Sequence, residues 1–263
     1  MDFTPFTAEL DGTSLFGVRR AGTGTPLVLI HGFGGSHRDW DALVAALPGG
    51  RPVIAYDQRG FGASSADPGA PFSHADDLLA LLDMLDIPQA DLCGMSLGGG
   101  SALEFALGHP LRVRRLVLVS PLMGGWPWTP AWIERWKEIG RAARAGDIAR
   151  ARALWWHHPL FDTLRESPAG TAMHAAIEAY HGRQWVQDDQ RPAVYDRDRL
   201  AALSVPTLLL TGARDVEDFR RIADAIAEAG RCVTRIDHPG AGHMLNLEIP
   251  EVIAGRVEAF LAG

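Results

Sequence analysis

The chain has 263 residues, enough for one large domain or for one domain with an insertion. Its composition, 47% hydrophobic and 22% charged, is typical of a soluble globular enzyme. The net charge of −7 provides no basic surface for nucleic acid, so we expect no nucleic-acid partner.

The two cysteines, Cys93 and Cys232, lie far apart in the sequence. They do not form a disulfide framework, and two cysteines alone do not make a structural zinc site. The first residues lack a basic region followed by an apolar one, so we expect no signal peptide. No apolar run approaches the length of a membrane span. We therefore expect a cytoplasmic protein without a membrane partner.

Short apolar runs alternate with helical patterns along most of the chain. The segment 13–26 is typical of an antiparallel hairpin at a sheet edge. Runs bounded by glycine or proline predict five buried strands, at 26–30, 52–56, 91–95, 116–120 and 206–210. Apolar periodicity predicts helices at 76–86, 101–109 and 219–230. This alternation predicts an α/β fold with a parallel sheet covered on both faces.

The alternation breaks between residues 122 and 195, where no strong strand pattern occurs. Seven of the eight tryptophans fall in this segment. We interpret 122–195 as a helical cap inserted in a single domain, 1–263, whose core comprises 1–121 and 196–263. Four cap histidines do not have the spacing of a recognised metal site: His157, His158, His174 and His181. We therefore expect no metal.

Residues 94–98, Gly-Met-Ser-Leu-Gly, connect a predicted strand directly to a predicted helix. Flanking glycines let the neighbouring backbone approach closely, and a serine in such a turn projects from the carboxyl edge of the sheet. The N-terminus of the next helix favours a developing negative charge. The pentapeptide alone fits equally a nucleophile at Ser96 and a turn that merely uses glycine.

A nucleophilic serine needs a base and an orienting carboxylate, which follow this type of turn in the order acid, histidine. Asp215 comes directly after a predicted strand, and His243 follows a later strand in a glycine-flanked loop. Glu217 and Asp218 are alternatives for the acid. Asp218 falls where a helix begins, which fits a role in that helix's first turn. We therefore favour Ser96, His243 and Asp215 as the catalytic residues.

A tetrahedral intermediate also needs hydrogen-bond donors for its oxyanion. We expect one to be the backbone N–H of Leu97, directly after the serine. The second is expected from Phe33, in the glycine-rich loop HGFGGSHRDW at 31–40. His31 at the start of this loop is expected to hold it by hydrogen bonds. No Gly-Lys-Ser/Thr follows the glycines, so the loop is not typical of phosphate binding.

Five segments resemble those of the α/β-hydrolase family, in the expected order and across the whole chain. They are HGFGGSHRDW (31–40), YDQRGFGASS (56–65), GMSLGG (94–99), GARD (212–215) and GAGHMLNLE (240–248). The resemblance implies an eight-stranded, mostly parallel sheet with a helical cap after the sixth strand. Relatives that dehalogenate alkanes or open epoxides carry aspartate at the position of Ser96. Because this chain has serine there, we expect neither of these two activities. Asp57 and Arg59 match a family loop that is structural.

Within that family the chain is similar to serine carboxylesterases, enol-lactonases and carbon–carbon bond hydrolases. The favoured hypothesis is hydrolysis of a small-molecule ester or lactone through an acyl-enzyme, with no cofactor. One alternative is a carbon–carbon bond hydrolase acting on a diketone. Another is a perhydrolase or acyltransferase, in which a nucleophile other than water captures the acyl group. A non-enzymatic alternative is a ligand receptor with almost no turnover.

Apolar residues near the expected site are candidates for the substrate pocket. They are Trp126, Trp128, Leu122, Met123 and Met244. Trp126 and Trp128 are the best candidates for an aromatic wall, because they come soonest after the strand that ends at Ser120. Packing of the cap is the alternative role for most of its tryptophans. Arg135 or Arg183 could bind a carboxylate. A substrate that carries an acidic group, such as the enol-lactone of a dicarboxylate, is therefore a further alternative.

Overall fold

The computed structural model describes residues 3–191 and 196–263, and it confirms the predicted fold class. Eight strands form one sheet in the order β1-β2-β4-β3-β5-β6-β7-β8. Their bounds are β1 Thr4–Leu10, β2 Thr13–Arg20, β3 Leu27–Ile30, β4 Val53–Tyr56, β5 Ala90–Met95, β6 Val113–Val119, β7 Thr207–Gly212 and β8 Val233–His238. Pairings β1–β2 and β2–β4 are antiparallel, and the rest are parallel.

The N-terminal hairpin lies earlier in the chain than expected. Its strands are β1 and β2, which pair from Thr4 with Arg19 to Leu10 with Thr13. The expected segment, 13–26, contains only the second strand. Most of β1 is exposed and only Ala8 is buried, so this edge strand carries a weak apolar pattern. That weakness is why the sequence did not reveal it.

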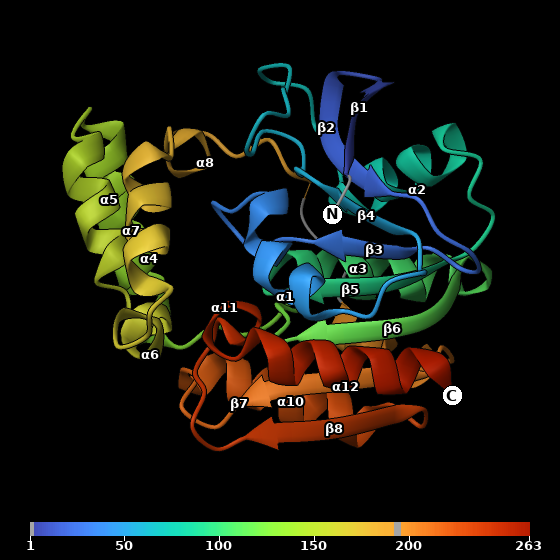
Figure 1. The fold of residues 1–263 in the computed structure, drawn as a ribbon. Coiled ribbons are helices and arrows are strands. Elements are labelled where there is room, and N and C mark those ends of the chain that lie inside the picture. The colour runs from blue at the N-terminus through green and yellow to red at the C-terminus, as the bar shows by residue number, and fades with distance from the viewer. Residues whose placement is uncertain (1–2, 192–195) are drawn as a thin grey trace.

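Helices cover both faces of the sheet, as Figure 1 shows. Two large apolar clusters lie on opposite faces, because alternate side chains of each buried strand point in opposite directions. Helices α1 (Asp41–Ala46) and α12 (Pro250–Ala262) pack on one face. Helices α2 (His74–Met84), α3 (Leu97–Gly108) and α10 (Glu217–Ala229) pack on the other.

A group of helices gathers beyond the carboxyl ends of the strands, at the left of Figure 1. It comprises α4 (Pro130–Arg144), α5 (Ile148–Trp156), α6 (Asp162–Arg165), α7 (Gly170–Ala179) and α8 (Arg183–Val186). We refer to these helices and their connections as the cap. The expected end of the cap at 195 and the first two residues of the expected core lie outside the described residues.

Shorter elements complete the described chain. They are the helices α9 (Asp196–Arg199) and α11 (Leu245–Glu248) and the 3-10 turns His37–Trp40, Pro110–Arg112, Pro159–Phe161 and Leu200–Ala202. Cys93 is buried in β5, and Cys232 is exposed. Across the described ranges, no helix combines the length and apolar character needed to cross a membrane.

Candidate active site

Ser96 occupies the turn between β5 and α3 in a strained backbone conformation. Its φ of 51° and ψ of −115° are unfavourable for a residue with a Cβ. Three backbone hydrogen bonds hold it: Ser96 N–H donates to Val119 O (3.0 Å), and Ser96 O accepts from Gly100 N (2.9 Å) and Leu122 N (2.8 Å). The surrounding backbone therefore fixes the serine at the carboxyl edge of the sheet.

Two glycines let three backbone segments meet around Ser96. A Cβ on Gly98 would lie 2.2 Å from Ile30 O, so the start of α3 touches the end of β3. A Cβ on Gly32 would lie 2.8 Å from the Met95 sulfur and 3.4 Å from Ser96 Cβ. The 31–40 loop therefore reaches the serine only because these positions lack side chains.

The structure brings Ser96, His243 and Asp215 together by hydrogen bonds. His243 Nε2 lies 3.0 Å from Ser96 Oγ, and His243 Nδ1 lies 2.9 Å from Asp215 Oδ2. The other carboxylate oxygen of Asp215 accepts from Val216 N at 2.7 Å. Because a carboxylate accepts, Nδ1 carries the proton and Nε2 presents a lone pair to the serine hydroxyl. At 8%, 2% and 6% exposed respectively, the three residues are shielded from bulk water.

The alternative acids have other partners. Asp218, in the first turn of α10, accepts from Thr129 N (3.0 Å), Thr129 Oγ1 (2.6 Å) and Trp126 Nε1 (3.3 Å). It therefore joins the start of the cap to the core. Glu217 pairs with Arg221 on the surface at 2.5 Å. Of the three candidate acids, Asp215 is the one that reaches His243.

The backbone N–H groups of Leu97 and Phe33 remain available as donors. Leu97 is the first residue of α3, where an N–H has no partner within the helix. Within the described residues, no hydrogen bond engages either N–H group. Both flank Ser96 on segments that the glycines bring into contact with it. They can therefore donate to an oxyanion formed at the serine.

His31 holds the 31–40 loop. Its Nδ1 donates to Gly32 O (2.7 Å), while its Nε2 accepts from Gln58 N (2.9 Å). Gln58 Nε2 also donates to His31 O at 2.8 Å. Burial lowers the pKa of His31, which keeps the ring neutral and suits one donor and one acceptor nitrogen. These contacts match the structural role expected from the sequence.

The next loop is also structural in its contacts. Asp57 accepts from His37 N (2.6 Å), His37 Nδ1 (2.8 Å) and Ala63 N (2.8 Å). Burial alone would raise the pKa of Asp57, but these hydrogen bonds hold it below its usual value. Arg59 forms a two-pronged pair with Asp77, at 2.8 and 2.6 Å. Neither Asp57 nor Arg59 lines the pocket beside Ser96.

Glu248 is a positioning residue that the sequence pattern alone did not single out. Its two carboxylate oxygens accept from the backbone on both sides of His243: from Gly242 N at 2.7 Å and from Met244 N at 3.0 Å. Thr163, in the cap, donates to the same carboxylate at 2.9 Å. Glu248 thus fixes the loop that carries His243. Its place at the end of the GAGHMLNLE segment is the sequence feature that could have indicated it.

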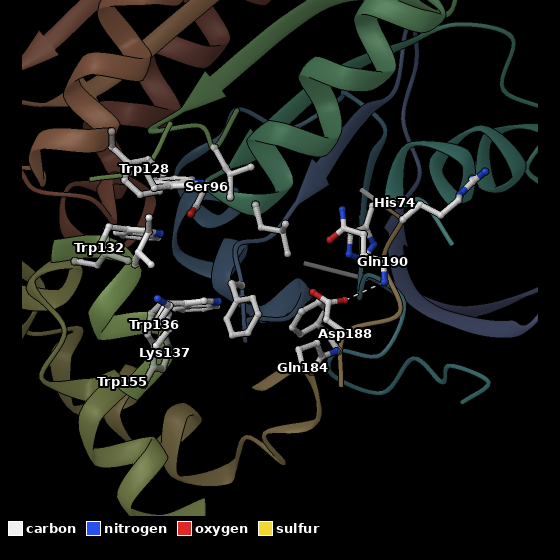
Figure 2. Close-up of a pocket in the computed structure, with 18 of the residues that line it drawn as sticks. His74, Ser96, Trp128, Trp132, Trp136, Lys137, Trp155, Gln184, Asp188 and Gln190 are labelled. Atoms are coloured by element: carbon white, nitrogen blue, oxygen red, sulfur yellow. Dashed lines mark hydrogen bonds between the residues drawn. The ribbon is translucent and has the colours of Figure 1, made fainter. Parts of the chain in front are cut away.

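A cavity of about 430 Å³ runs from Ser96 between the core and the cap (Figure 2). One wall is aromatic, formed by Phe33, Trp128, Trp132, Trp136, Trp155 and Phe219. The rings of Trp128 and Trp132 stack at 4.5 Å, and those of Trp132 and Trp136 at 6.2 Å. This ladder gives the cavity a flat apolar side that suits an acyl chain or a ring.

A second chamber, of about 30 Å³, lies against Ser96 and His243. Met244 and Asp39 are among its lining residues. Burial raises the pKa of Asp39 to about 7, so its carboxyl group is partly protonated near neutral pH. This limits the negative charge beside the position where an oxyanion would form. The chamber holds about one water molecule or a very small substituent.

The structure corrects two of the five predicted pocket residues. Leu122 and Trp128 line the large cavity, and Met244 lines the small chamber. Met123 is instead buried in one apolar cluster of the core, whereas Leu122 packs against the other. Trp126 packs against that same core, with its indole N–H on Asp218. The prediction relied on closeness in sequence to the end of β6, and this does not determine whether the side chains of Met123 and Trp126 face the cavity or the core.

Other pocket residues were missed. Trp132 and Trp136 lie one turn apart on α4, and this spacing could have indicated a shared face. Neither arginine considered for a carboxylate lines the cavity. Arg183 donates to Ala66 O at 2.7 Å, and Arg135 is exposed. Over the described ranges, no group of three or more His, Cys, Asp or Glu side chains could hold a metal ion.

Comparison with known proteins identifies the family. The sequence model of the alpha/beta hydrolase fold matches residues 25–216, well over half of the chain. The chain belongs to the α/β-hydrolase family. A protein of Variovorax paradoxus (strain S110) named "Putative carbamate hydrolase RutD" is 41% identical over 258 residues, or 91% of this chain and 92% of the relative.

Two further similarities concern different reactions. A 2-hydroxymuconate semialdehyde hydrolase of Pseudomonas sp. (strain CF600) is 39% identical over 130 residues, which is 43% of this chain and 46% of that protein. The crystal structure of the enol-lactonase from Burkholderia xenovorans LB400 superimposes with a TM-score of 0.84 at 25% identity. That similarity covers 98% of this chain and 100% of the enol-lactonase. Related members of the family therefore act on different bonds.

Proposed function

We propose that this protein is a serine hydrolase that cleaves a carboxylic ester or lactone through an acyl-enzyme on Ser96. The observation that carries the proposal is the buried chain of hydrogen bonds from Ser96 Oγ through His243 to Asp215. The backbone N–H groups of Phe33 and Leu97, which have no partner in the described part of the chain and lie beside the same serine, support it. The enol-lactonase similarity adds support, because a lactone is a cyclic ester.

In the proposed reaction, His243 Nε2 removes the hydroxyl proton as Ser96 Oγ bonds to the carbonyl carbon. The carbonyl π electrons move to oxygen, where the Phe33 and Leu97 N–H groups stabilise the oxyanion. Asp215 stabilises the imidazolium form of His243. The tetrahedral intermediate then expels the alkoxide, which takes the proton from His243. Water attacks the acyl-enzyme by the same route and releases the acid.

The two cavities suggest an asymmetric substrate. The larger part of the molecule fits the cavity of about 430 Å³, against the tryptophan ladder. The chamber of about 30 Å³ leaves room for only a small substituent on the other side of the scissile bond. The favoured substrate is therefore a small to medium ester or lactone with one apolar or aromatic arm.

The test is hydrolysis of short p-nitrophenyl esters and simple lactones by the wild type and by Ser96→Ala. The proposal predicts turnover by the wild type alone, with both proteins folded by circular dichroism. Equal turnover by both would refute the role of Ser96. Absence of turnover on the whole panel by a folded wild type would refute ester hydrolysis.

Carbon–carbon bond hydrolysis is the second candidate, favoured by the 39% identity to a 2-hydroxymuconate semialdehyde hydrolase. The same three side chains would then act on a ketone. A panel of vinylogous diketones, with loss of substrate absorbance as the readout, distinguishes it from ester hydrolysis. Hydrogen peroxide or an added alcohol in the ester assay tests capture of the acyl group by another nucleophile. A receptor would bind these ligands with almost no turnover.

A further inference from the structure

The end of the large cavity away from Ser96 is polar. Figure 2 shows the tryptophan ladder and Ser96 on one side and His74, Gln184, Asp188 and Gln190 on the other. His74 is the first residue of α2, and the other three belong to the chain segment that begins at α8. Core and cap thus both contribute to this second wall. The reaction proposed above uses none of these four residues.

His74 is a buried histidine that lines the cavity. It is 3% exposed, and nothing in the described ranges hydrogen-bonds to its Nδ1. Its ring packs edge-on against Phe72, with centroids 5.0 Å apart, and lies 6.2 Å from Phe61. Burial lowers the pKa of His74 to about 3, so the ring is neutral at physiological pH. An unpaired polar atom in such surroundings is unfavourable unless a ligand or water satisfies it.

Gln190 is held beside this wall by its backbone. Phe72 N donates to Asp189 O at 3.2 Å, and Arg191 N donates to Phe72 O at 2.7 Å, so the segment pairs with Phe72 as a short parallel bridge. The side-chain amide of Gln190 makes no hydrogen bond within the described residues. Gln184 differs, because its amide donates to Gly60 O at 2.8 Å. Gln190 is therefore placed firmly while its amide stays available.

We propose that His74 and Gln190 form a subsite for an uncharged hydrogen-bonding group, such as a hydroxyl or an amide, on the arm of the substrate remote from the scissile bond. This inference rests on the proposed function and specifies its substrate class: an ester or lactone whose long arm ends in a neutral polar group. A neutral imidazole and a carboxamide each offer a donor and an acceptor, which matches the same pair on a hydroxyl or an amide.

The charges around this wall argue against a carboxylate as the recognised group. His74 and Gln190 are both neutral. Asp188 lies beside them and accepts from Gln190 N at 3.0 Å, so it would repel an anion. Arg191 is paired with Asp76. Lys137 is exposed on the opposite wall, on α4. A neutral group therefore fits the subsite with no uncompensated charge.

The experiment compares esters that differ only at the remote end. Methyl esters of ω-hydroxy fatty acids of increasing chain length are each paired with the ester that ends in CH₃ in place of OH. The mirror series, acetates of diols against acetates of plain alcohols, places the long arm on the alcohol side. At the chain length that reaches His74, we expect the hydroxyl to raise kcat/KM about tenfold, as one or two neutral hydrogen bonds allow.

Substitutions then assign the preference to the subsite. His74→Phe keeps a planar ring for Phe61 and Phe72 to pack against, and should abolish the hydroxyl preference. Gln190→Leu should reduce it and does not depend on His74→Phe folding. The matched control is His158→Phe, because His158 is equally buried and packs on Trp132 and Trp155, outside this cavity wall. Its Nε2, like Nδ1 of His74, has no partner among the described residues. His158→Phe should keep the wild-type ratio.

Three outcomes would overturn the inference. One is turnover without any hydroxyl preference in either series. The second is a preference that survives in both His74→Phe and Gln190→Leu. The third is a stronger preference for the matching ω-carboxylate that is lost in Lys137→Gln.

Failure of the proposed function is recognised separately. If no ester is cleaved, tryptophan fluorescence of Ser96→Ala measures binding of alkane diols against the matching monoalcohols at the tryptophan ladder. Tighter diol binding that His74→Phe removes would support the subsite without ester hydrolysis. Equal binding of diol and monoalcohol would refute the subsite.

Discussion

The two ends of the large cavity are built in different ways. At the Ser96 end, the functional side chains come from strand ends, and hydrogen bonds engage every polar side-chain atom of the Ser96, His243 and Asp215 set. At the far end, His74 and Gln190 come from a helix start and a loop, and their side chains lack partners within the described chain. The difference fits our two proposals, a preorganised catalytic site at the Ser96 end and a ligand-binding subsite at the far end.

The largest effect is expected when the proposed general base, His243, is removed from the Ser96 end of the cavity. His243→Ala should lower kcat by at least about 10⁴-fold, because the serine loses the group that accepts its proton. The measurement is steady-state hydrolysis of the best p-nitrophenyl ester. His238→Asn, at the end of β8, is the matched control and should retain activity, since His238 is not among the residues that line the two cavities beside Ser96. A loss of less than tenfold in His243→Ala would contradict the assignment of the base.

Removing the side chain that holds the His243 loop should lower activity less than removing His243 itself. Glu248→Ala removes the acceptor for Gly242 N and Met244 N, and should lower kcat by about 10- to 100-fold with little change in KM. It should also cost about 1–3 kcal/mol of unfolding free energy, because buried N–H groups lose their partner. Glu248→Gln, which keeps one oxygen acceptor, should recover part of the activity. Glu251→Ala, exposed on α12, is the control.

If Glu248→Ala and Glu251→Ala lost activity equally, Glu248 would not be a positioning residue. A rise in KM at constant kcat would also contradict this account, because it would place Glu248 in substrate binding.

The aromatic wall gives a third test, by a matched pair of tryptophans. Trp132→Leu removes the middle ring of the ladder and should raise KM for esters with a bulky arm by about 3- to 10-fold, leaving kcat nearly unchanged. Trp126→Leu should leave KM unchanged, since Trp126 packs into the core. It should instead lower stability, measured by thermal unfolding. A KM increase in Trp126→Leu equal to that of Trp132→Leu would restore the pocket role assigned to Trp126 from the sequence.

The smallest expected effect is the contribution of His74, at the far end of the cavity, to the pH dependence of the free energy of unfolding. The pKa of His74 is lowered to about 3 in the folded protein, below the value near 6.5 that it has when unfolded. Between these values the unfolded state binds more protons, so the wild type loses stability as pH falls below 6.5. His74→Phe lacks this loss and should lose about 1–2 kcal/mol less than the wild type between pH 7 and pH 5.

Urea unfolding at both pH values measures that difference. Parallel stability curves for the wild type and His74→Phe would contradict a buried, neutral His74.

How much the sequence predicts follows the same division. Ser96, Asp215 and His243 were predictable because parallel strands bring their carboxyl ends to one edge, so residues far apart in the chain meet there. The role of Glu248 and the position of the N-terminal hairpin were not predictable. A residue that holds a loop by hydrogen bonds has no characteristic sequence pattern, and a mostly exposed edge strand has only a weak apolar one. In the cap, packing decides which tryptophans face the cavity. Nothing in the order of residues around His74 indicates that its ring reaches the cavity.

The most direct test of the central claim is covalent trapping of the nucleophile. The protein is treated with a p-nitrophenyl alkylphosphonate, which transfers its phosphonyl group to an activated serine and releases p-nitrophenol. Intact-mass measurement and peptide mapping then locate the adduct. The account predicts one phosphonyl group per chain, on Ser96, with activity lost in proportion to labelling and no adduct in Ser96→Ala. Labelling at another residue, or full activity in a protein labelled at Ser96, would contradict it.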